Sequence, residues 1–141
     1  MNTMQDKIAD LQRRRAAAEL GGGADRLDKQ RQAGKLTARE RVAALVAPDS
    51  FDETGLFAAH RATLFGMAGK SPPAACVVTG AAAVAGRLVH LASQDFTVAG
   101  GSAGETHSEK VADIMHMALK TGSPFVFIND SGGARVQEGI D

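Results

Sequence analysis

The sequence predicts an α/β fold in which two adjacent strands are followed by a helix and a further strand. Two β-rich runs, residues 76–79 and 88–93, flank an Ala-Gly turn, as expected for an antiparallel hairpin. Apolar residues then recur at helical spacing, at Val111, Ile114, Met115, Ala118 and Leu119. The apolar run 125–128 lies directly after Pro124. A strand that is reached through a helix in this way favours an α/β fold with a right-handed crossover.

Three helices are predicted before the hairpin. The first covers residues 4–20, where apolar residues recur at helical spacing before a run of three glycines. The second covers residues 25–32. The third covers residues 38–46 and opens with Thr37 and Glu40, a capping-box pair whose side chains satisfy backbone N–H groups at the helix start.

We expect residues 1–47 to form a helical arm and residues 48–141 to form the α/β domain. The arm is basic, because residues 1–41 hold ten Lys and Arg against six Asp and Glu, although the whole chain has a net charge of zero. Arg39 and Arg41 flank the first turn of the third helix. They either bind an anionic ligand or only keep the helix face solvated.

Composition argues against several classes of function. The lone cysteine, Cys76, excludes an internal disulfide and a cysteine-based zinc site, and its apolar surroundings disfavour a nucleophile. The chain has six Phe, no Trp or Tyr, and balanced charge, so we expect no nucleic-acid binding. Residues 66–71 match a phosphate loop only in part, because Leu64 stands where the first glycine is needed. Without an apolar leader or a bilayer-length apolar run, we expect a cytoplasmic protein that does not enter a membrane.

Two glycine-rich turns follow predicted strands. The first, residues 94–104, leads into the long helix, for which Ser102 and Glu105 have the spacing of a capping box. The second, residues 129–133, follows the last strand. Both turns then lie at the carboxyl ends of strands, which is the edge where open α/β sheets bind ligands.

Gly132 and Gly133 are candidates for an oxyanion hole. Adjacent glycines accept positive φ and let a ligand approach the backbone closely. Two N–H groups placed before a helix start can face an oxygen that carries negative charge. The alternative is that these glycines only permit the bend between a strand and the following residues.

Seven motifs along the chain resemble the β subunit of biotin-dependent acyl-CoA carboxylases, together with the related carboxyltransferases and decarboxylases. The most specific is Asn129-Asp-Ser-Gly-Gly-Ala-Arg-Val-Gln-Glu-Gly139. The others occur in the expected order: Thr37-Ala-Arg-Glu-Arg-Val42, Val77-Val-Thr-Gly80, Ser93-Gln-Asp-Phe-Thr-Val98, Gly100-Gly-Ser102, Gly104-Glu105 and Glu109-Lys110.

The resemblance implies a carboxyltransferase of the crotonase-like fold, which is built from β-β-α units. In that family, carboxybiotin on a carrier protein or domain gives its carboxyl group to the α-carbon of an acyl-CoA, through an enolate. Gly132 and Gly133 would stabilise the thioester oxygen, with no bound metal. Coenzyme A would bind along Phe96, Thr97, Gly100 and Gly101, with Arg39 and Arg41 at its phosphates. The implied partners are acyl-CoA, a biotinylated α subunit and further β subunits of a homo-oligomer.

The chain departs from the family pattern at two places and in length. Ala75-Cys76 stands where Asp-Gly is usual, and Ala99 stands where an aromatic residue is usual. Family members are several times longer, so we expect the 141 residues to lack carboxyltransferase activity by themselves. Two alternatives remain open: another crotonase-like CoA enzyme such as a hydratase, and a fragment that binds CoA or assembles with a partner without chemistry.

Overall fold

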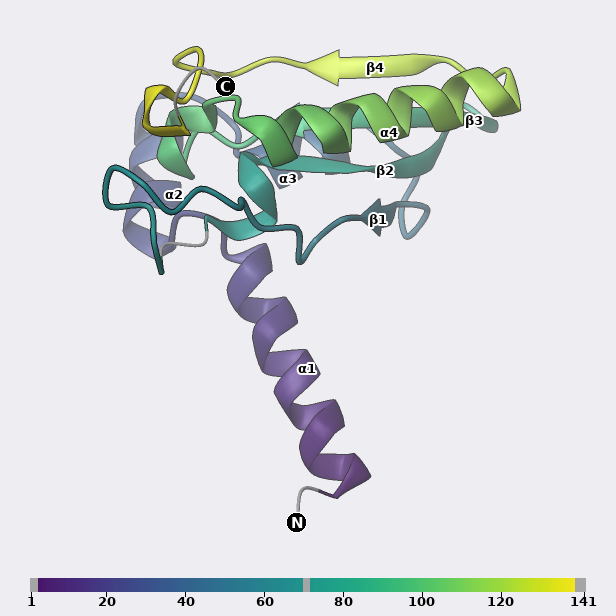
Figure 1. Ribbon diagram of the computed structural model, residues 1–141. Helices are drawn as coiled ribbons and strands as arrows, with labels where there is room; N and C mark the ends of the chain where they lie inside the picture. The colour runs from purple at the N-terminus through teal and green to yellow at the C-terminus, as the bar shows by residue number, and fades with distance from the viewer. Residues whose placement is uncertain (1–2, 70–71, 139–141) are drawn as a thin grey trace.

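The computed structural model describes residues 3–69 and 72–138, and it confirms a mixed α/β fold (Figure 1). Lys70 and Ser71 of the partial phosphate loop, and Gly139 at the end of the last motif, lie outside the described residues. The elements are, in chain order, α1 Met4–Glu19, α2 Ala24–Gln32, α3 Ala38–Leu45, β1 Asp52–Thr54, η1 Pro73–Cys76, β2 Val77–Val84, β3 Arg87–Gln94, η2 Ala99–Gly101, α4 Glu105–Thr121, β4 Phe125–Ile128 and η3 Val136–Glu138.

The four strands form one sheet in the order β1-β2-β3-β4. The predicted hairpin is confirmed, because β2 and β3 pair antiparallel from Val77 opposite Gln94 to Val84 opposite Arg87. Ala85 and Gly86 join them with φ values of 49° and 75°, as a tight two-residue hairpin turn requires. The helix α4 leads from β3 to β4, and these two strands pair parallel.

One side of the sheet packs on α4, but not through the whole predicted stripe. Ile114 and Ala118 are buried, and Ile114 packs with Val77 and Ala92 of the sheet. Leu119 and Met115, which were predicted in the core, are exposed by 79% and 49%. The buried face of α4 is instead rotated toward its polar residues Thr106, His107 and Lys110.

The predicted capping box at the start of α4 is wrong. The N-cap residue is Gly104, with no side-chain cap. The Ser102 hydroxyl donates to the Ala99 carbonyl at 2.8 Å and is therefore engaged elsewhere. The N–H of Glu105 instead donates to the carboxylate of Glu138, a residue far away in the sequence, at 2.8 Å.

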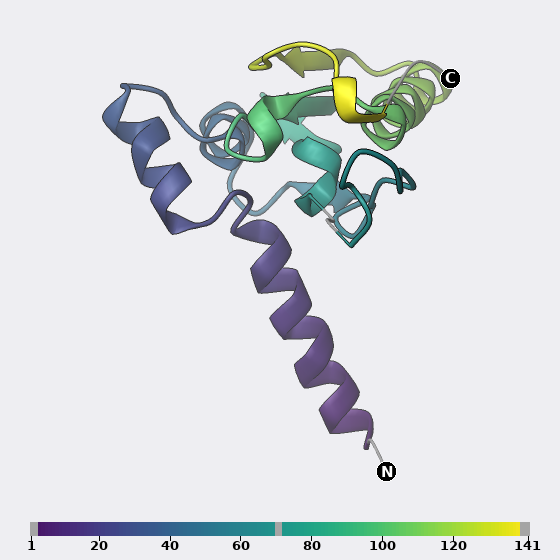
Figure 2. The same ribbon diagram turned by 60° about the vertical axis from the view of Figure 1, so that its left-hand side comes forward.

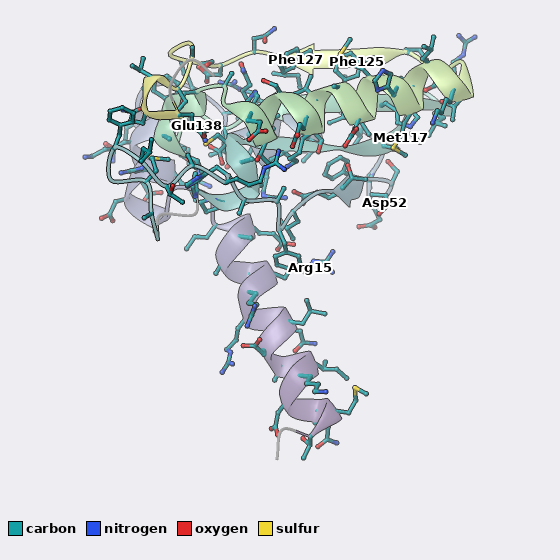
Figure 3. All side chains as sticks on the ribbon, in the orientation of Figure 1. Arg15, Asp52, Met117, Phe125, Phe127 and Glu138 are labelled. Atoms are coloured by element: carbon teal, nitrogen blue, oxygen red, sulfur yellow. The ribbon has the colours of Figure 1, made fainter. Side chains whose placement is uncertain are left out.

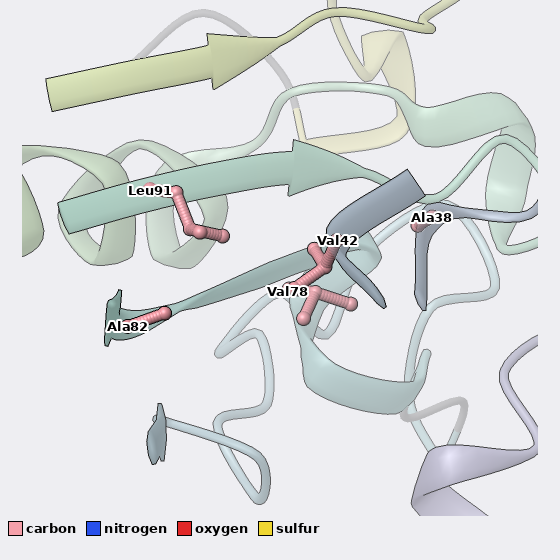
Figure 4. Close-up of a cluster of buried hydrophobic side chains, with 5 residues drawn as sticks. All are labelled: Ala38, Val42, Val78, Ala82 and Leu91. Atoms are coloured by element: carbon pink, nitrogen blue, oxygen red, sulfur yellow. The ribbon is translucent and has the colours of Figure 1, made fainter. Parts of the chain in front are cut away.

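The helix α3 belongs to the same core as the sheet. Its Ala38 and Val42 pack with Val78, Ala82 and Leu91 (Figure 4). The predicted capping box at its start is confirmed, with Thr37 and Glu40 exchanging side-chain and backbone hydrogen bonds. A boundary at residue 47 stays a prediction, and it would divide a shared core.

The helix α1 projects away from the rest of the molecule (Figures 1 and 2). None of its residues is buried, and its side chains stand out on all sides (Figure 3). Among the described residues, no helix has both the length and the apolar character needed to span a bilayer.

Leu91 and Leu119 provide a matched test of the core. Leu91 is 0% exposed, so Leu91→Ala should lower the free energy of unfolding by about 2–5 kcal/mol through lost burial and a residual cavity. Leu119→Ala, at a position that is 79% exposed, should change it by less than about 0.5 kcal/mol. Urea denaturation followed by circular dichroism measures both; equal losses would show that the sheet is not packed as described.

Candidate functional site

The two glycine-rich turns lie side by side and are hydrogen bonded to each other. The N–H of Gly132 donates to the Gly100 carbonyl at 2.9 Å, and the N–H of Ala103 donates to the Gly133 carbonyl at 2.9 Å. Ala103 and Ala134 form an isolated parallel bridge between the two turns. Because β3 and β4 run parallel, the prediction that both turns share the carboxyl edge of the sheet is confirmed.

The two candidate oxyanion amides already have acceptors within the chain. The N–H of Gly132 is bound by the Gly100 carbonyl, and the N–H of Gly133 donates to the Ser131 hydroxyl at 3.1 Å. Both glycines are solvent-exposed, and Gly133 has a φ of 115°, which favours glycine. An oxyanion at this position would therefore have to replace two existing acceptors.

A cavity of about 500 Å³ opens beside the first turn, between that turn and α2. Its lining includes Phe96, Thr97 and Gly100, three of the six residues predicted to bind coenzyme A. The remaining lining residues are Ala99 and, on α2, Arg26, Lys29, Gln30 and Ala33. We call this cavity the α2 groove. Gly101, another of the six, is buried in the same turn.

The α2 groove is basic on one wall and aromatic on the other. Arg26 and Lys29 form no ion pair with any residue of ranges 3–69 and 72–138, and the Arg26 guanidinium donates to the Thr97 carbonyl at 3.2 Å. Lys35 lies over the Phe96 ring, with Nζ 5.2 Å from the ring centroid. Cations beside an exposed ring suit a ligand that carries both phosphates and an aromatic base.

The structure does not bring Arg39 and Arg41 to this groove. Arg39 donates two hydrogen bonds to the Glu53 carboxylate, at 2.7 and 2.9 Å. Arg41 donates to the Asp130 carboxylate at 2.6 Å. A role for Arg39 and Arg41 at coenzyme A phosphates therefore stays a prediction. Arg26 and Lys29, which do line the groove, belong to the same basic arm and were not predicted.

A left-handed turn lies beneath the glycine turns, at the start of β2. Ala74, Ala75 and Cys76 have φ values of 49°, 52° and 66°, a conformation that costs roughly 1–2 kcal/mol per residue with a Cβ. The buried Lys110 of α4 donates from Nζ to the Ala74 carbonyl at 2.8 Å and to the Val77 carbonyl at 2.6 Å. These bonds satisfy one carbonyl of the turn and the carbonyl of the first residue of β2.

The polar face of α4 connects this turn to the second glycine turn. Nδ1 of His107 lies 3.1 Å from the Ala75 carbonyl, which assigns the proton to Nδ1, and Nε2 lies 3.3 Å from Nε2 of Gln94. The Gln94 carbonyl oxygen accepts the N–H of Asp130 at 3.0 Å. Burial lowers the pKa of His107, in agreement with a neutral ring that accepts from Gln94.

The thiol of Cys76 is not activated. Burial raises its pKa to about 11, although the Arg135 guanidinium, 2.8 Å from the sulfur, favours the thiolate. This agrees with the expectation that Cys76 is no nucleophile. Over residues 3–69 and 72–138, His, Cys, Asp and Glu side chains form no group of three or more that could hold a metal ion.

The buried Lys110 should make stability depend on pH. Burial lowers its pKa from 10.5 to about 8, so above pH 8 the unfolded chain binds more protons than the folded chain, and the free energy of unfolding rises with pH. Above pH 9 the Cys76 thiol opposes this rise, because its pKa is raised from 9.0 to about 11. We therefore expect the free energy of unfolding to rise between pH 8 and 9. Lys110→Met should abolish this rise, whereas Lys29→Met, at an exposed lysine, should retain it. Urea titrations at each pH test this, and equal slopes in all three proteins would contradict it.

Gly100 and Gly101 allow a test of the contact between the two turns. Both have left-handed φ values, 65° and 62°, so alanine at either position should be strained. A Cβ at Gly101 would also collide with the Asp130 carbonyl, whereas a Cβ at Gly100 would meet nothing within 4 Å. Gly101→Ala should therefore lower the free energy of unfolding by about 1–3 kcal/mol more than Gly100→Ala. Equal losses in thermal or urea denaturation would show that the turns are not in contact.

Residues 29–141 match the family described as the carboxyl transferase domain. The methylmalonyl-CoA carboxyltransferase 12S subunit of Propionibacterium freudenreichii subsp. shermanii is 56% identical over 140 residues, which are 99% of this chain and 27% of that protein. The propionyl-CoA carboxylase beta chain of Roseobacter denitrificans is 54% identical over 98% of this chain and 27% of its own length. The mitochondrial propionyl-CoA carboxylase beta chain of Sus scrofa is 49% identical over 93% of this chain and 25% of its own length.

A solved structure agrees with these matches. The transcarboxylase 12S crystal structure, a hexamer with methylmalonyl-coenzyme A and methylmalonic acid bound, superposes with a TM-score of 0.96 and 55% identity over 99% of this chain and 27% of that chain. The chain thus spans about a quarter of the length of the curated relatives it matches. With a family match that begins inside α2 and runs to residue 141, the chain belongs to the carboxyl transferase domain family.

Proposed function

We propose that this chain is the coenzyme A-binding portion of a biotin-dependent acyl-CoA carboxyltransferase with the crotonase-like fold. The observation that carries the proposal is the α2 groove, which places two cations and an exposed aromatic ring next to the paired glycine turns. The family match and the similarity to proteins named for methylmalonyl-CoA and propionyl-CoA support the same ligand class.

In the proposed complex, each part of the acyl-CoA meets a different part of this edge. The phosphates bind Arg26 and Lys29, because these side chains are basic and unpaired within the described ranges. The adenine packs on Phe96, whose ring is 42% exposed. The pantetheine arm then runs past Gly100 and Gly101 and brings the thioester to Gly132 and Gly133.

The chemistry requires charge stabilisation on the thioester oxygen. Loss of the α-proton would leave an enolate. Carboxybiotin, when bound, would supply the carboxyl group: its N–carboxyl bond would break as the bond to the α-carbon forms, and the released ureido nitrogen would take up the α-proton. Gly132 and Gly133 would donate their N–H groups to the enolate oxygen in exchange for the Gly100 carbonyl and the Ser131 hydroxyl. The biotinylated partner, further β subunits of a homo-oligomer and a cytoplasmic location belong to the same proposal.

A second candidate function is coenzyme A binding without chemistry. The observation that favours it is that both candidate amides already donate within the chain. A fragment with an intact groove and occupied amides would bind coenzyme A but would leave the thioester unactivated. The two candidates share the groove, so binding tests the groove and turnover separates the candidates.

Calorimetric titration with coenzyme A tests the groove. The double variant Arg26→Ala, Lys29→Ala should weaken binding by roughly tenfold or more, since a loss of about 1.4 kcal/mol corresponds to a factor of ten. The effect should shrink at high salt, because exposed charges are screened. The matched control, Arg13→Ala, Arg15→Ala on the projecting α1, removes the same charge far from the groove and should leave affinity unchanged. Equal weakening in both variants would exclude the groove as the phosphate site.

A further inference from the structure

Asp130 lies between the N-terminal arm and the glycine pair. Its carboxylate, only 9% exposed, accepts hydrogen bonds from Arg41 of α3 at 2.6 Å, from Gln30 of α2 at 3.0 Å and from Lys35 at 3.1 Å. Three donors from three parts of the arm thus converge on one residue of the second glycine turn. Such charge-assisted bonds are stronger and more directional than neutral ones.

Two of these three donors also lie at the α2 groove, where coenzyme A is proposed to bind. Gln30 lines the α2 groove, and Lys35 lies over Phe96, with Nζ 5.2 Å from the ring centroid. Asp130 is therefore bonded to the same side chains that border the proposed ligand.

The backbone of Asp130 is held as firmly as its side chain. Its N–H donates to the Gln94 side chain at 3.0 Å. Its carbonyl oxygen packs so closely on Gly101 that a Cβ there would not fit. Within the next three residues, Gly132 donates to the Gly100 carbonyl and Gly133 to the Ser131 hydroxyl. Asp130 thus lies within three residues of both candidate oxyanion amides and contacts the first glycine turn directly.

The carboxylate stays charged in this environment. Burial by itself would raise the pKa of Asp130, but hydrogen bonds from Arg41, Lys35 and Gln30 outweigh it, and the pKa is lowered. The three donors therefore face an anion at neutral pH.

We propose that Asp130 is a positioning residue that ties the glycine pair to the coenzyme-binding arm, so that the amides of Gly132 and Gly133 are set relative to the groove. The proposal rests on the proposed function only for the identity of the ligand, coenzyme A. An ordinary structural ion pair is available for comparison: the Glu53 side chain is equally buried, at 9%, and its carboxylate accepts hydrogen bonds from Arg39 of the same arm.

The first experiment measures the glycine amides without ligand, in ¹⁵N-labelled protein. Asp130→Asn should move the ¹H–¹⁵N resonances of Gly132 and Gly133 and speed hydrogen exchange of the Gly132 amide by about tenfold, because its acceptor on Gly100 is no longer held in register. Glu53→Gln, the matched loss of one buried carboxylate charge, should change that rate by less than about twofold. Equal changes in the two variants, or none in Asp130→Asn, would overturn the proposal.

The second experiment adds coenzyme A to the same samples. In the wild-type chain, resonances of α2 and of Gly132 and Gly133 should titrate together. In Asp130→Asn the α2 resonances should still titrate, while the glycine resonances stay unmoved. Glycine shifts identical to wild type would contradict the positioning role. If coenzyme A does not bind the wild-type chain at all, the proposed function fails, and the ligand-free exchange rates still decide the role of Asp130.

Milder variants answer the question if Asp130→Asn does not fold. Gln30→Ala and Lys35→Ala each remove one donor and leave the Arg41 ion pair in place. Each should speed exchange of the Gly132 amide by a smaller factor, and the double variant by more than either. Unchanged exchange in the double variant would show that the arm does not hold the glycine turn.

Discussion

The parallel pairing of β3 with β4 is the interaction on which the rest of this structure depends. Parallel strands end at the same edge of a sheet, so the glycine turns that follow β3 and β4 must lie beside each other. The hydrogen bond from Gly132 to Gly100 and the bridge between Ala103 and Ala134 continue that pairing beyond the strands. The α2 groove and the contacts of Asp130 all lie along this shared edge.

The buried face of α4 shows why polar residues occupy a core position. The left-handed turn at residues 74–76 directs carbonyl groups into the space between η1 and α4, where they need donors. Lys110 and His107 supply these donors, and a helix with only apolar residues on this face would leave buried acceptors unsatisfied. The position where this chain has Ala75-Cys76 in place of the usual Asp-Gly is the very turn that these residues support.

In the arm, charge alone does not tell which basic side chains line the groove. Some of its basic residues bind carboxylates of the same chain, as Arg39 and Arg41 do, while Arg26 and Lys29 line the groove, and Lys35 does both by binding Asp130 and lying over Phe96. Both groups look alike in sequence, because a guanidinium that stabilises a carboxylate and one that binds a phosphate have the same chemistry. Only the distance from each basic side chain to the nearest carboxylate, which the folded structure sets, distinguishes the two kinds of residue.

Local rules determined much of this protein from sequence alone. The hairpin, the start of α3 at Thr37 and the placement of both glycine turns after strands follow from periodicity, capping and turn chemistry, which act within a few residues. The motifs also identified the family. Tertiary structure decided which face of α4 is buried, which carboxylate caps it, which arginines are paired and which acceptors hold the glycine amides. Each of these depends on groups far apart in the chain, such as Glu105 with Glu138 or Arg41 with Asp130, and sequence spacing carries no information about such distances.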